Sequence, residues 1–341
     1  MKKSLLVLAI AGACLNAAHA QSSVTVYGDV DVGLVKKTDT TLAIGKRDSN
    51  ALGFKGVEDL GGGLKALFQV EIRFEPDTGT LESVTRPLFQ GQSRVGLQGD
   101  FGMLRLGRGV SALMESIQAF EPFHGLPTTT GFYTDVIVAG YTNQPLDAAG
   151  NSFNRMSNAL FYNSPEFNGF QLNTTVATKE ANSGIALIGR GTAALPQYPA
   201  NAQASANPFS VSATYKSGPV AALAAYERNV VESKLWTLGA SVIASGDIKL
   251  MADYSRQDRG HTLAANSKTK AWVIGVNYAI GAGKLLAGYG RKQPDGVVAT
   301  REASIGYEHS LSKRSYIYVD ASNKKAATAV RYYDVGIRHA F

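Results

Sequence analysis

The sequence predicts an all-β fold, a sixteen-stranded antiparallel barrel that crosses a membrane. Three observations lead to this fold class. Apolar and polar residues alternate with a period of two, short turns alternate with long loops, and tyrosines gather near the ends of the alternating segments. The 36 glycines and 15 tyrosines among 341 residues, with only two tryptophans, point in the same direction.

Residues 1–20 have the parts of a secretory signal peptide. Two lysines are followed by an apolar core and by Ala18-His19-Ala20, a small-x-small cleavage site. The apolar core is shorter than the ~20 residues that a membrane-spanning helix needs. A lipoprotein signal that ends at Cys14 is an alternative interpretation of the same stretch. Cleavage after Ala20 would leave one barrel domain, 21–341, without any cysteine, so we expect an exported protein that needs no disulfide.

Several classes of protein are disfavoured. No later apolar run approaches the length of a membrane helix, which excludes a helical membrane protein. The formal net charge is +7 and basic residues are scattered without runs, so we expect no nucleic-acid partner. Later histidines are isolated and no Gly-x-Ser-x-Gly motif occurs, so we expect no enzyme activity, no cofactor and no metal site. These histidines are His124, His261, His309 and His339.

Period-two alternation marks the expected strands along the chain. In the first of them, Val24, Val26 and Val30 share one face, whereas Thr25 and Asp29 occupy the other. Such a pattern is typical of a strand with one apolar and one polar face. The clearest alternating segments are 24–34, 247–256, 269–280, 301–311 and the last eleven residues.

The connections between these segments alternate in length. Seven short turns interleave with eight longer polar stretches, and fifteen connections predict sixteen strands. Such alternation is typical of an up-and-down barrel that has short turns at one rim and long loops at the other. The short turns are 59–63, 99–102, 165–169, 217–219, 245–247, 281–283 and 312–313. The longer stretches are 37–46, 76–88, 111–152, 181–207, 230–234, 258–268, 293–300 and 323–328.

Alternation alone does not distinguish a soluble β protein from a membrane barrel, in which the polar face points inward. Sixteen strands of ~10 residues in one closed sheet enclose an interior too wide for side chains to fill. The tyrosines near strand ends fit aromatic girdles at a bilayer interface, and the chain ends on an aromatic residue, Phe341. These features favour the membrane barrel, with a soluble exported β protein as the alternative.

The longest connection, 111–152, far exceeds the usual ~4–6 residues. It is too rich in Phe, Tyr, Ile and Val for plain disorder, and long ordered connections are usually functional. It carries four carboxylates, of which Glu115 and Glu121 are preferred over Asp135 and Asp147 as functional groups. Each of them could instead cap a short helix or bond to the loop backbone.

Five stretches from one end of the chain to the other carry a resemblance to a known family. They are SSVTVYGDVDVGLV, LGFKGVEDLGGGLKALFQVE, SRVGLQGDFGMLRLGR, NALFYNSPEFNGFQL and the terminal DVGIRHAF. Through them the chain resembles the general diffusion porins of Gram-negative bacteria, especially the β-proteobacterial branch. The resemblance implies a trimeric outer-membrane barrel, with the 111–152 loop folded into the lumen as a constriction. It also implies that the outer-membrane assembly machinery reads Phe341, and that small hydrophilic solutes diffuse through the pore.

In this family, arginines on the barrel wall face carboxylates on the inward loop. Arg94 in SRVGL and Arg155 in FNRMSNALFYNSPEF match two of these arginines, but Ala51 stands where a third is expected. Arg73 has the same parity as Glu71, which should face the lumen. We therefore hypothesise that Arg73 partly replaces the missing arginine.

Two further residues, Lys65 and Arg105, share the lumen-facing parity. An arginine that faces lipid near the bilayer midplane would cost ~2–4 kcal/mol, which favours lumen positions for such residues. The excess of wall arginines predicts a preference for anions, which Ala51 would weaken. We expect a homotrimer in outer-membrane lipid that passes small hydrophilic solutes and anions. The alternatives are a substrate-selective channel and a structural or adhesive barrel of the same membrane.

Overall fold

The computed structural model describes residues 23–83, 86–128, 130–138, 141–145, 154–179, 206–259 and 268–341. The expected signal peptide, His261 and Asp147 lie outside these ranges. The strands are β1 Ser23–Lys37, β2 Ala43–Gly45, β3 Asn50–Gly61, β4 Leu64–Phe74, β5 Gln92–Gly99, β6 Gly102–Val110, β7 Arg155–Asn163, β8 Phe170–Ala177, β9 Phe209–Ser217, β10 Val220–Arg228, β11 Lys234–Ser245, β12 Ile248–Asp258, β13 Lys268–Ile280, β14 Gly283–Pro294, β15 Thr300–Ser310, β16 Ser315–Lys325 and β17 Ala329–Ala340. The helices are α2 Ala112–Ile117, the 3₁₀ turn η2 Gln118–Phe120 and the π-helical turn η3 Tyr133–Ile137.

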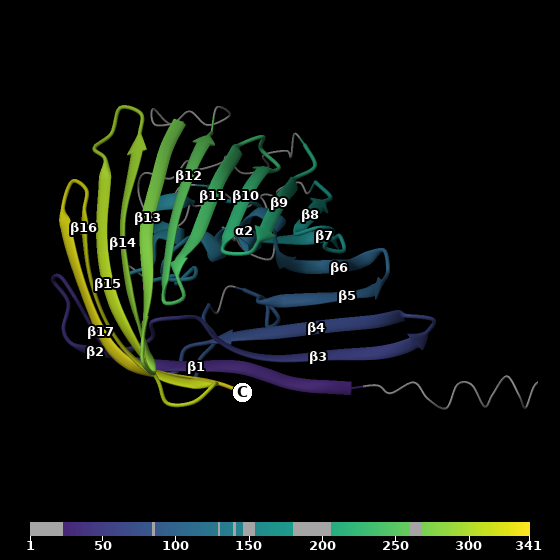
Figure 1. Ribbon diagram of the computed structural model, residues 1–341, viewed down its shortest axis with the longest axis horizontal. Helices are drawn as coiled ribbons and strands as arrows, with labels where there is room; N and C mark the ends of the chain where they lie inside the picture. The colour runs from purple at the N-terminus through teal and green to yellow at the C-terminus, as the bar shows by residue number, and fades with distance from the viewer. Residues whose placement is uncertain are drawn as a thin grey trace, which may run out of the picture.

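The strands form one closed antiparallel barrel (Figure 1). β1 closes it, because it pairs with β3 from Ser23 to Asp29 and with β17 from Asp29 to Lys37. Of the 17 strands in the described sheet, β2 is a three-residue strand that pairs only with β1, so sixteen strands make up the barrel. The predicted fold class is therefore confirmed, and β2 is the one strand that the sequence pattern missed.

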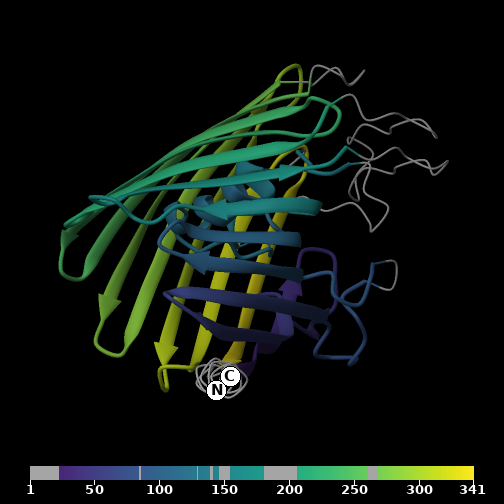
Figure 2. The ribbon, with the colours of Figure 1, turned by 90° about the vertical axis from the view of Figure 1, so that its right-hand side faces the viewer.

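The two rims of the barrel differ as predicted. All seven expected short turns lie at hairpin ends, and the described parts of the longer connections lie at the opposite rim (Figure 2). No helix within the described ranges is long and apolar enough to cross a membrane.

The outer face of the barrel is apolar and the inner face is polar. In β1, Val24 is 67% exposed and Leu34 is 44% exposed, whereas Asp31 is fully buried. The same inversion occurs in β17, where Val335 is 50% exposed and the neighbouring Asp334 is 3% exposed. An exposed apolar band around a polar interior is the arrangement that lipid stabilises, because the outward side chains are solvated by acyl chains.

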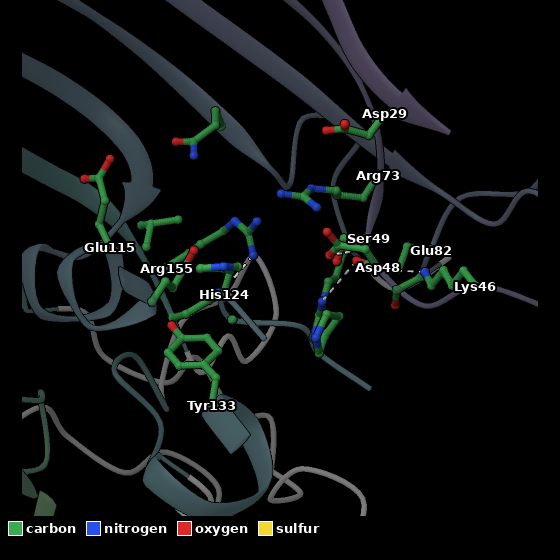
Figure 3. A pocket seen from close by; sticks show the side chains of 18 of the residues that line it. Asp29, Lys46, Asp48, Ser49, Arg73, Glu82, Glu115, His124, Tyr133 and Arg155 are labelled. Carbon is green, nitrogen blue, oxygen red and sulfur yellow. Dashed lines mark hydrogen bonds and ion pairs between the residues drawn. The ribbon is translucent and has the colours of Figure 1, made fainter. Parts of the chain in front are cut away.

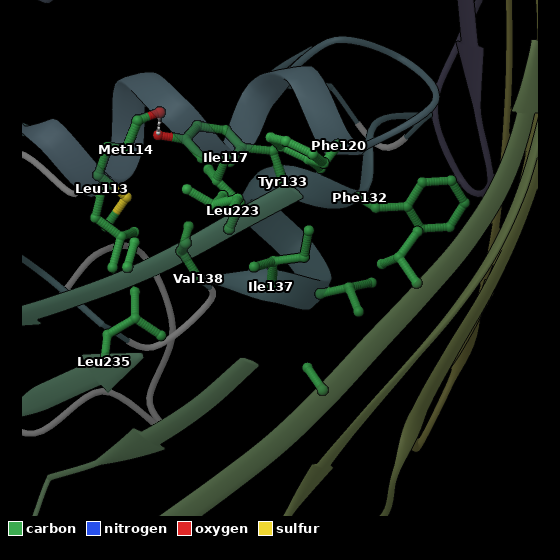
Figure 4. Close-up of a cluster of buried hydrophobic side chains, with 14 of the residues drawn as sticks. Leu113, Met114, Ile117, Phe120, Phe132, Tyr133, Ile137, Val138, Leu223 and Leu235 are labelled. Carbon is green, nitrogen blue, oxygen red and sulfur yellow. Dashed lines mark hydrogen bonds between the residues drawn. The ribbon is translucent and has the colours of Figure 1, made fainter. Parts of the chain in front are cut away.

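The apolar core of the protein lies on the polar side of the sheet. The long segment (residues 111–145) packs its apolar side chains against β10, β11, β13 and β14 (Figure 4). Ser255 and Gln257 of β12 donate hydrogen bonds to the carbonyl of Ile137, at 3.0 and 2.9 Å. The buried contributors from this segment include Leu113, Met114, Ile117, Phe120, Phe123, Phe132, Tyr133, Val136 and Ile137.

Two glycines of the barrel wall give this segment room to approach the strands. A Cβ on Gly275 would lie 2.6 Å from Cγ of Pro122, and a Cβ on Gly288 would lie 2.5 Å from Cε2 of Phe132. Any side chain at either position would push the segment away from the wall. The aromatic and aliphatic residues that made this loop unusual in the sequence are therefore explained by packing.

Candidate functional site

A cavity of about 700 Å³ separates the long segment from β1, β4 and β17 (Figure 3). Its lining is strongly charged and evenly balanced, with five basic and five acidic side chains among the described residues. The basic ones are Lys46, Arg73, Arg86, Arg155 and Arg338, and the acidic ones are Asp29, Asp48, Glu75, Glu82 and Glu115. Three sequence-predicted residues (Arg73, Arg155 and Glu115) therefore meet at one cavity.

Arg73 is held near the outer end of β4. Its Nε lies 2.9 Å from Oε1 of Glu71, and the hydroxyl of Tyr27 donates to the other carboxylate oxygen of Glu71 at 3.1 Å. The side chain of Arg73 borders the cavity. An acidic neighbour on the same strand offsets much of its charge.

Arg155 is the first residue of β7, and two of its hydrogen bonds go to neutral acceptors. Its Nε donates to the carbonyl of Gly91 at 2.7 Å, and its Nη1 donates to Oδ1 of Asn154 at 3.0 Å. Figure 3 shows its side chain beside His124 of the long segment. The guanidinium therefore borders the cavity from the side where the long segment rejoins the wall.

Arg94 and Arg105 lie apart from the larger cavity and border a second cavity of about 180 Å³. Oε1 of Gln69 accepts hydrogen bonds from Nε and Nη2 of Arg94, at 3.1 and 2.9 Å. Oδ1 of Asn163 accepts from Nη2 of Arg105 at 2.5 Å. Within the described ranges neither arginine forms an ion pair, so side-chain amides orient both guanidinium groups without neutralising them.

The three loop carboxylates that the structure describes have three different surroundings. Glu115, in the first turn of α2, is exposed and borders the larger cavity. Asp135 borders neither cavity and forms an ion pair with Nζ of Lys324 in β16. Glu121 is fully buried and borders neither cavity.

Glu121 organises the long segment internally. Its carboxylate accepts hydrogen bonds from the backbone N–H groups of Phe123, Gly125 and Phe132, at 2.5, 3.4 and 3.3 Å. Burial raises the pKa of Glu121 to about 7, and these hydrogen bonds hold the pKa below the value that burial alone would impose. The residue takes the structural role that the sequence left open, rather than a place on the cavity surface.

His124 of the long segment and two residues named in the sequence analysis, Lys65 and Phe341, have other surroundings. Nδ2 of Asn277 donates to Nε2 of His124 at 3.2 Å, and burial lowers the pKa of His124 to about 4, so the ring is neutral. Lys65 is exposed and borders neither cavity. Phe341 pairs its backbone with Gly28, at 3.2 and 3.0 Å, which ties the chain end to β1.

Sequence reasoning missed the charged groups that connections contribute. Lys46 reaches two carboxylates, with Nζ 2.7 Å from Oε1 of Glu75 and 3.2 Å from Oε1 of Glu82. Burial would raise the pKa of Glu82, but Lys46 and Arg73 outweigh that effect and hold it below its usual value. Arg47, four positions before Ala51, also extends into the barrel interior. Strand parity does not apply to such residues, so only the composition of the loops could have drawn attention to them.

Among the described residues, no three His, Cys, Asp or Glu side chains gather in a way that could hold a metal ion. The site is therefore a charged cavity within a barrel, and two of the arginines that line it, Arg73 and Arg338, are paired with carboxylates.

Known proteins are similar to this chain over its whole length. A family model described as Gram-negative porin matches residues 4–328. Outer membrane porin protein 32 of Delftia acidovorans is 30% identical, with 100% of both chains covered, and an outer membrane porin of Bordetella pertussis is 25% identical with the same coverage. An anion-selective porin from Comamonas acidovorans superposes with a TM-score of 0.75 at 24% identity, covering 94% of this chain and 100% of the other. An outer membrane protein of Vibrio cholerae in its trimer form superposes with a TM-score of 0.65 at 13% identity, covering 94% and 99%.

Proposed function

Since the chain belongs to the Gram-negative porin family of outer-membrane barrels, we propose that it forms a water-filled channel for small hydrophilic solutes and ions. The observation that carries this proposal is the charged cavity of about 700 Å³ inside the barrel. Transport is passive diffusion, driven by the concentration gradient of the permeant and, for ions, by the potential across the membrane. Members of such a family are channels rather than enzymes.

The 111–152 loop sets the width of this channel. Its described residues pack on the polar face of β10 to β14, and Glu115 borders the cavity from the loop side while Arg73 and Arg155 border it from the wall side. Opposite charges on two sides of a narrow passage produce a transverse field, which favours charged and dipolar permeants over apolar ones.

The channel prefers anions. In the larger cavity the formal charges of the described lining cancel, so the preference arises from Arg94 and Arg105, which lack carboxylate partners within the described ranges. A fixed positive charge in a low-dielectric wall raises the local concentration of anions. The similar porin from Comamonas acidovorans is described as anion-selective, which supports the same preference here.

The proposal extends to assembly. We expect a homotrimer in outer-membrane lipid, since a similar barrel exists in trimer form. The exposed apolar side chains of the outer face can contact both lipid and neighbouring subunits. Residues 1–20 would direct export and then be removed. Phe341, 40% exposed beside β1, is accessible for recognition by the barrel assembly machinery.

Single-channel recording of the purified protein in planar bilayers tests the proposed function. We expect stepwise conductance in KCl, with three coupled steps for each inserted trimer. Liposomes that contain the protein should also swell in small sugars at rates that fall with solute size. A protein that inserts without conductance would contradict the channel and would favour a structural or adhesive barrel.

A substrate-selective channel is the second candidate, because the larger cavity presents donors and acceptors at close spacing. Conductance that one solute blocks in a saturable way would favour it over general diffusion. Equal permeation by unrelated solutes of one size would contradict it.

A further inference from the structure

Four of the inward-facing carboxylates on β1 and β15 to β17 form a cluster that we call the acidic wall: Asp31 of β1, Glu308 of β15, Asp320 of β16 and Asp334 of β17. Asp320 lies directly opposite Asp334 in the register of β16 and β17. Asp31, Asp320 and Asp334 are almost fully buried, with exposures of 0%, 2% and 3%. So dense a negative patch would attract cations into the lumen if nothing compensated it.

Arg47 reaches the acidic wall from a corner of the chain. The corner, residues 46–49, connects β2 to β3, and its backbone is fixed to β1. The N–H of Arg47 donates to Oδ1 of Asp31 at 2.8 Å. Nδ2 of Asn50, the first residue of β3, donates to the carbonyl of Asp31 at 3.1 Å. These bonds point the side chain of Arg47 across the barrel interior rather than along a strand.

The guanidinium of Arg47 is shared by two carboxylates. Its Nε and Nη2 donate to the two oxygens of Asp320, at 2.5 and 3.2 Å, and its Nη1 donates to Oε1 of Glu308 at 2.7 Å. Its Cζ lies 4.7 Å from the ring centroid of Tyr318. The side chain has no exposed surface, so its charge interacts with these two carboxylates rather than with solvent.

The other cation that pairs with the acidic wall in the described residues is Lys284. Its Nζ lies 3.0 Å from Oε2 of Glu308, and 35% of the lysine side chain is exposed. Arg338 lies nearby, but it pairs with Asp29 and Asp48. Formally, four carboxylates face two cations, and without Arg47 they would face only Lys284.

We propose that Arg47 is a selectivity-determining residue, because it offsets part of the negative charge of the acidic wall and lets the arginines of β4 to β7 dominate the field in the lumen. Its neighbours Lys46 and Asp48 both line the larger cavity, so the backbone of Arg47 lies beside that cavity. Fields reach about 8–10 Å at physiological salt, which is enough to act on an ion in that cavity. The inference rests on the proposed channel function.

The zero-current potential in a KCl gradient tests the inference. Arg47→Met should lower the ratio of chloride to potassium permeability several-fold, because Asp320 and Glu308 lose their shared cation. Arg47→Lys keeps a charge at this place and should stay close to the wild type. Arg331→Met is the matched control, since Arg331 is an exposed arginine near the outer end of β17. It should leave the ratio unchanged.

A second substitution separates charge from shape. Adding Asp320→Asn to Arg47→Met removes the carboxylate that Arg47 neutralised, and the permeability ratio should return toward the wild-type value. Asp320→Asn or Glu308→Gln alone should make the channel more anion-selective. If Arg47→Met does not assemble, these single variants test whether the acidic wall affects selectivity.

The outcomes distinguish this inference from the proposed function. Wild-type protein without conductance would contradict the channel itself. A conducting channel whose permeability ratio is indifferent to Arg47→Met, or to Asp320→Asn, would overturn the role of Arg47 and leave the channel intact.

Discussion

The two sides of the barrel interior use arginine in opposite ways. On the β4 to β7 side, Arg94 and Arg105 donate to the side-chain oxygens of Gln69 and Asn163, so their charges are oriented but not neutralised. On the acidic wall, Arg47 is enclosed by two carboxylates and an aromatic ring. The difference teaches that the partner of an arginine decides how it acts on selectivity: Arg94 and Arg105 add positive charge to the lumen, whereas Arg47 offsets carboxylates and also stabilises the fold.

The largest expected effect separates these roles through stability. Arg47→Ala should lower the free energy of unfolding by about 3–5 kcal/mol, because removing one partner of a buried ion pair leaves uncompensated charge. Arg94→Ala should cost about 1–3 kcal/mol, the usual range for hydrogen bonds to a charged group. Urea unfolding in detergent micelles, followed by tryptophan fluorescence, measures both. Equal losses would contradict the distinction between the two walls.

Glu121 tests what burial does to a carboxylate that has no cation in contact. Burial raises its pKa from 4.5 to about 7. The stability that this group contributes is therefore fully present below about pH 4.5 and is lost as the pH rises through about 7. The loss is on the order of 3 kcal/mol, since one pKa unit corresponds to about 1.4 kcal/mol.

Glu121→Gln should remove this dependence, because the amide does not titrate. Unfolding midpoints between pH 4 and pH 8 measure it, with the exposed Glu115→Gln as the matched control. If the wild type and Glu121→Gln lose stability in parallel over this interval, another group is responsible.

Selectivity should respond on the arginine side. A unit charge about 5 Å from an ion in water changes its energy by on the order of 1 kcal/mol. Arg94→Ala combined with Arg105→Ala should therefore lower the ratio of chloride to potassium permeability several-fold. Bi-ionic recordings at low salt measure this shift, and 1 M salt should reduce it through screening. A double variant that keeps the wild-type ratio would mean that these arginines do not set selectivity.

The smallest effect concerns Asp135, which pairs with Lys324 at a half-exposed position. Exposed ion pairs contribute about 0–1 kcal/mol, so Asp135→Asn should change stability by less than 1 kcal/mol. It should move the permeability ratio slightly toward anions, because Lys324 loses its partner. Lys324→Met should move the ratio in the opposite direction. A large loss of stability in either variant would show that this pair anchors the long segment.

Much of the fold could be predicted from the sequence because its signals are local. Period-two alternation decides which face of β1 or β17 is apolar, and turn lengths decide which rim a hairpin belongs to. The short strand β2 escaped prediction because three residues inside a polar connection show no periodicity.

Strand parity pointed to some of the residues that border the larger cavity, but it does not apply to residues in connections. Arg73 and Arg155 belong to strands, and both border the larger cavity. Arg47 lies in a connection, and its partners Glu308 and Asp320 are 261 and 273 positions away along the chain. The burial of Glu121 depends on how the backbone folds around it, which the composition of the loop does not reveal.

The zero-current potential of the wild-type channel in a KCl gradient tests the central claim most directly. We expect a potential of the sign that chloride selectivity produces, larger at low salt than at high salt. A potential of the sign that potassium selectivity produces would contradict the account, because it would mean that the acidic wall, and not the arginines of β4 to β7, controls the field in the lumen.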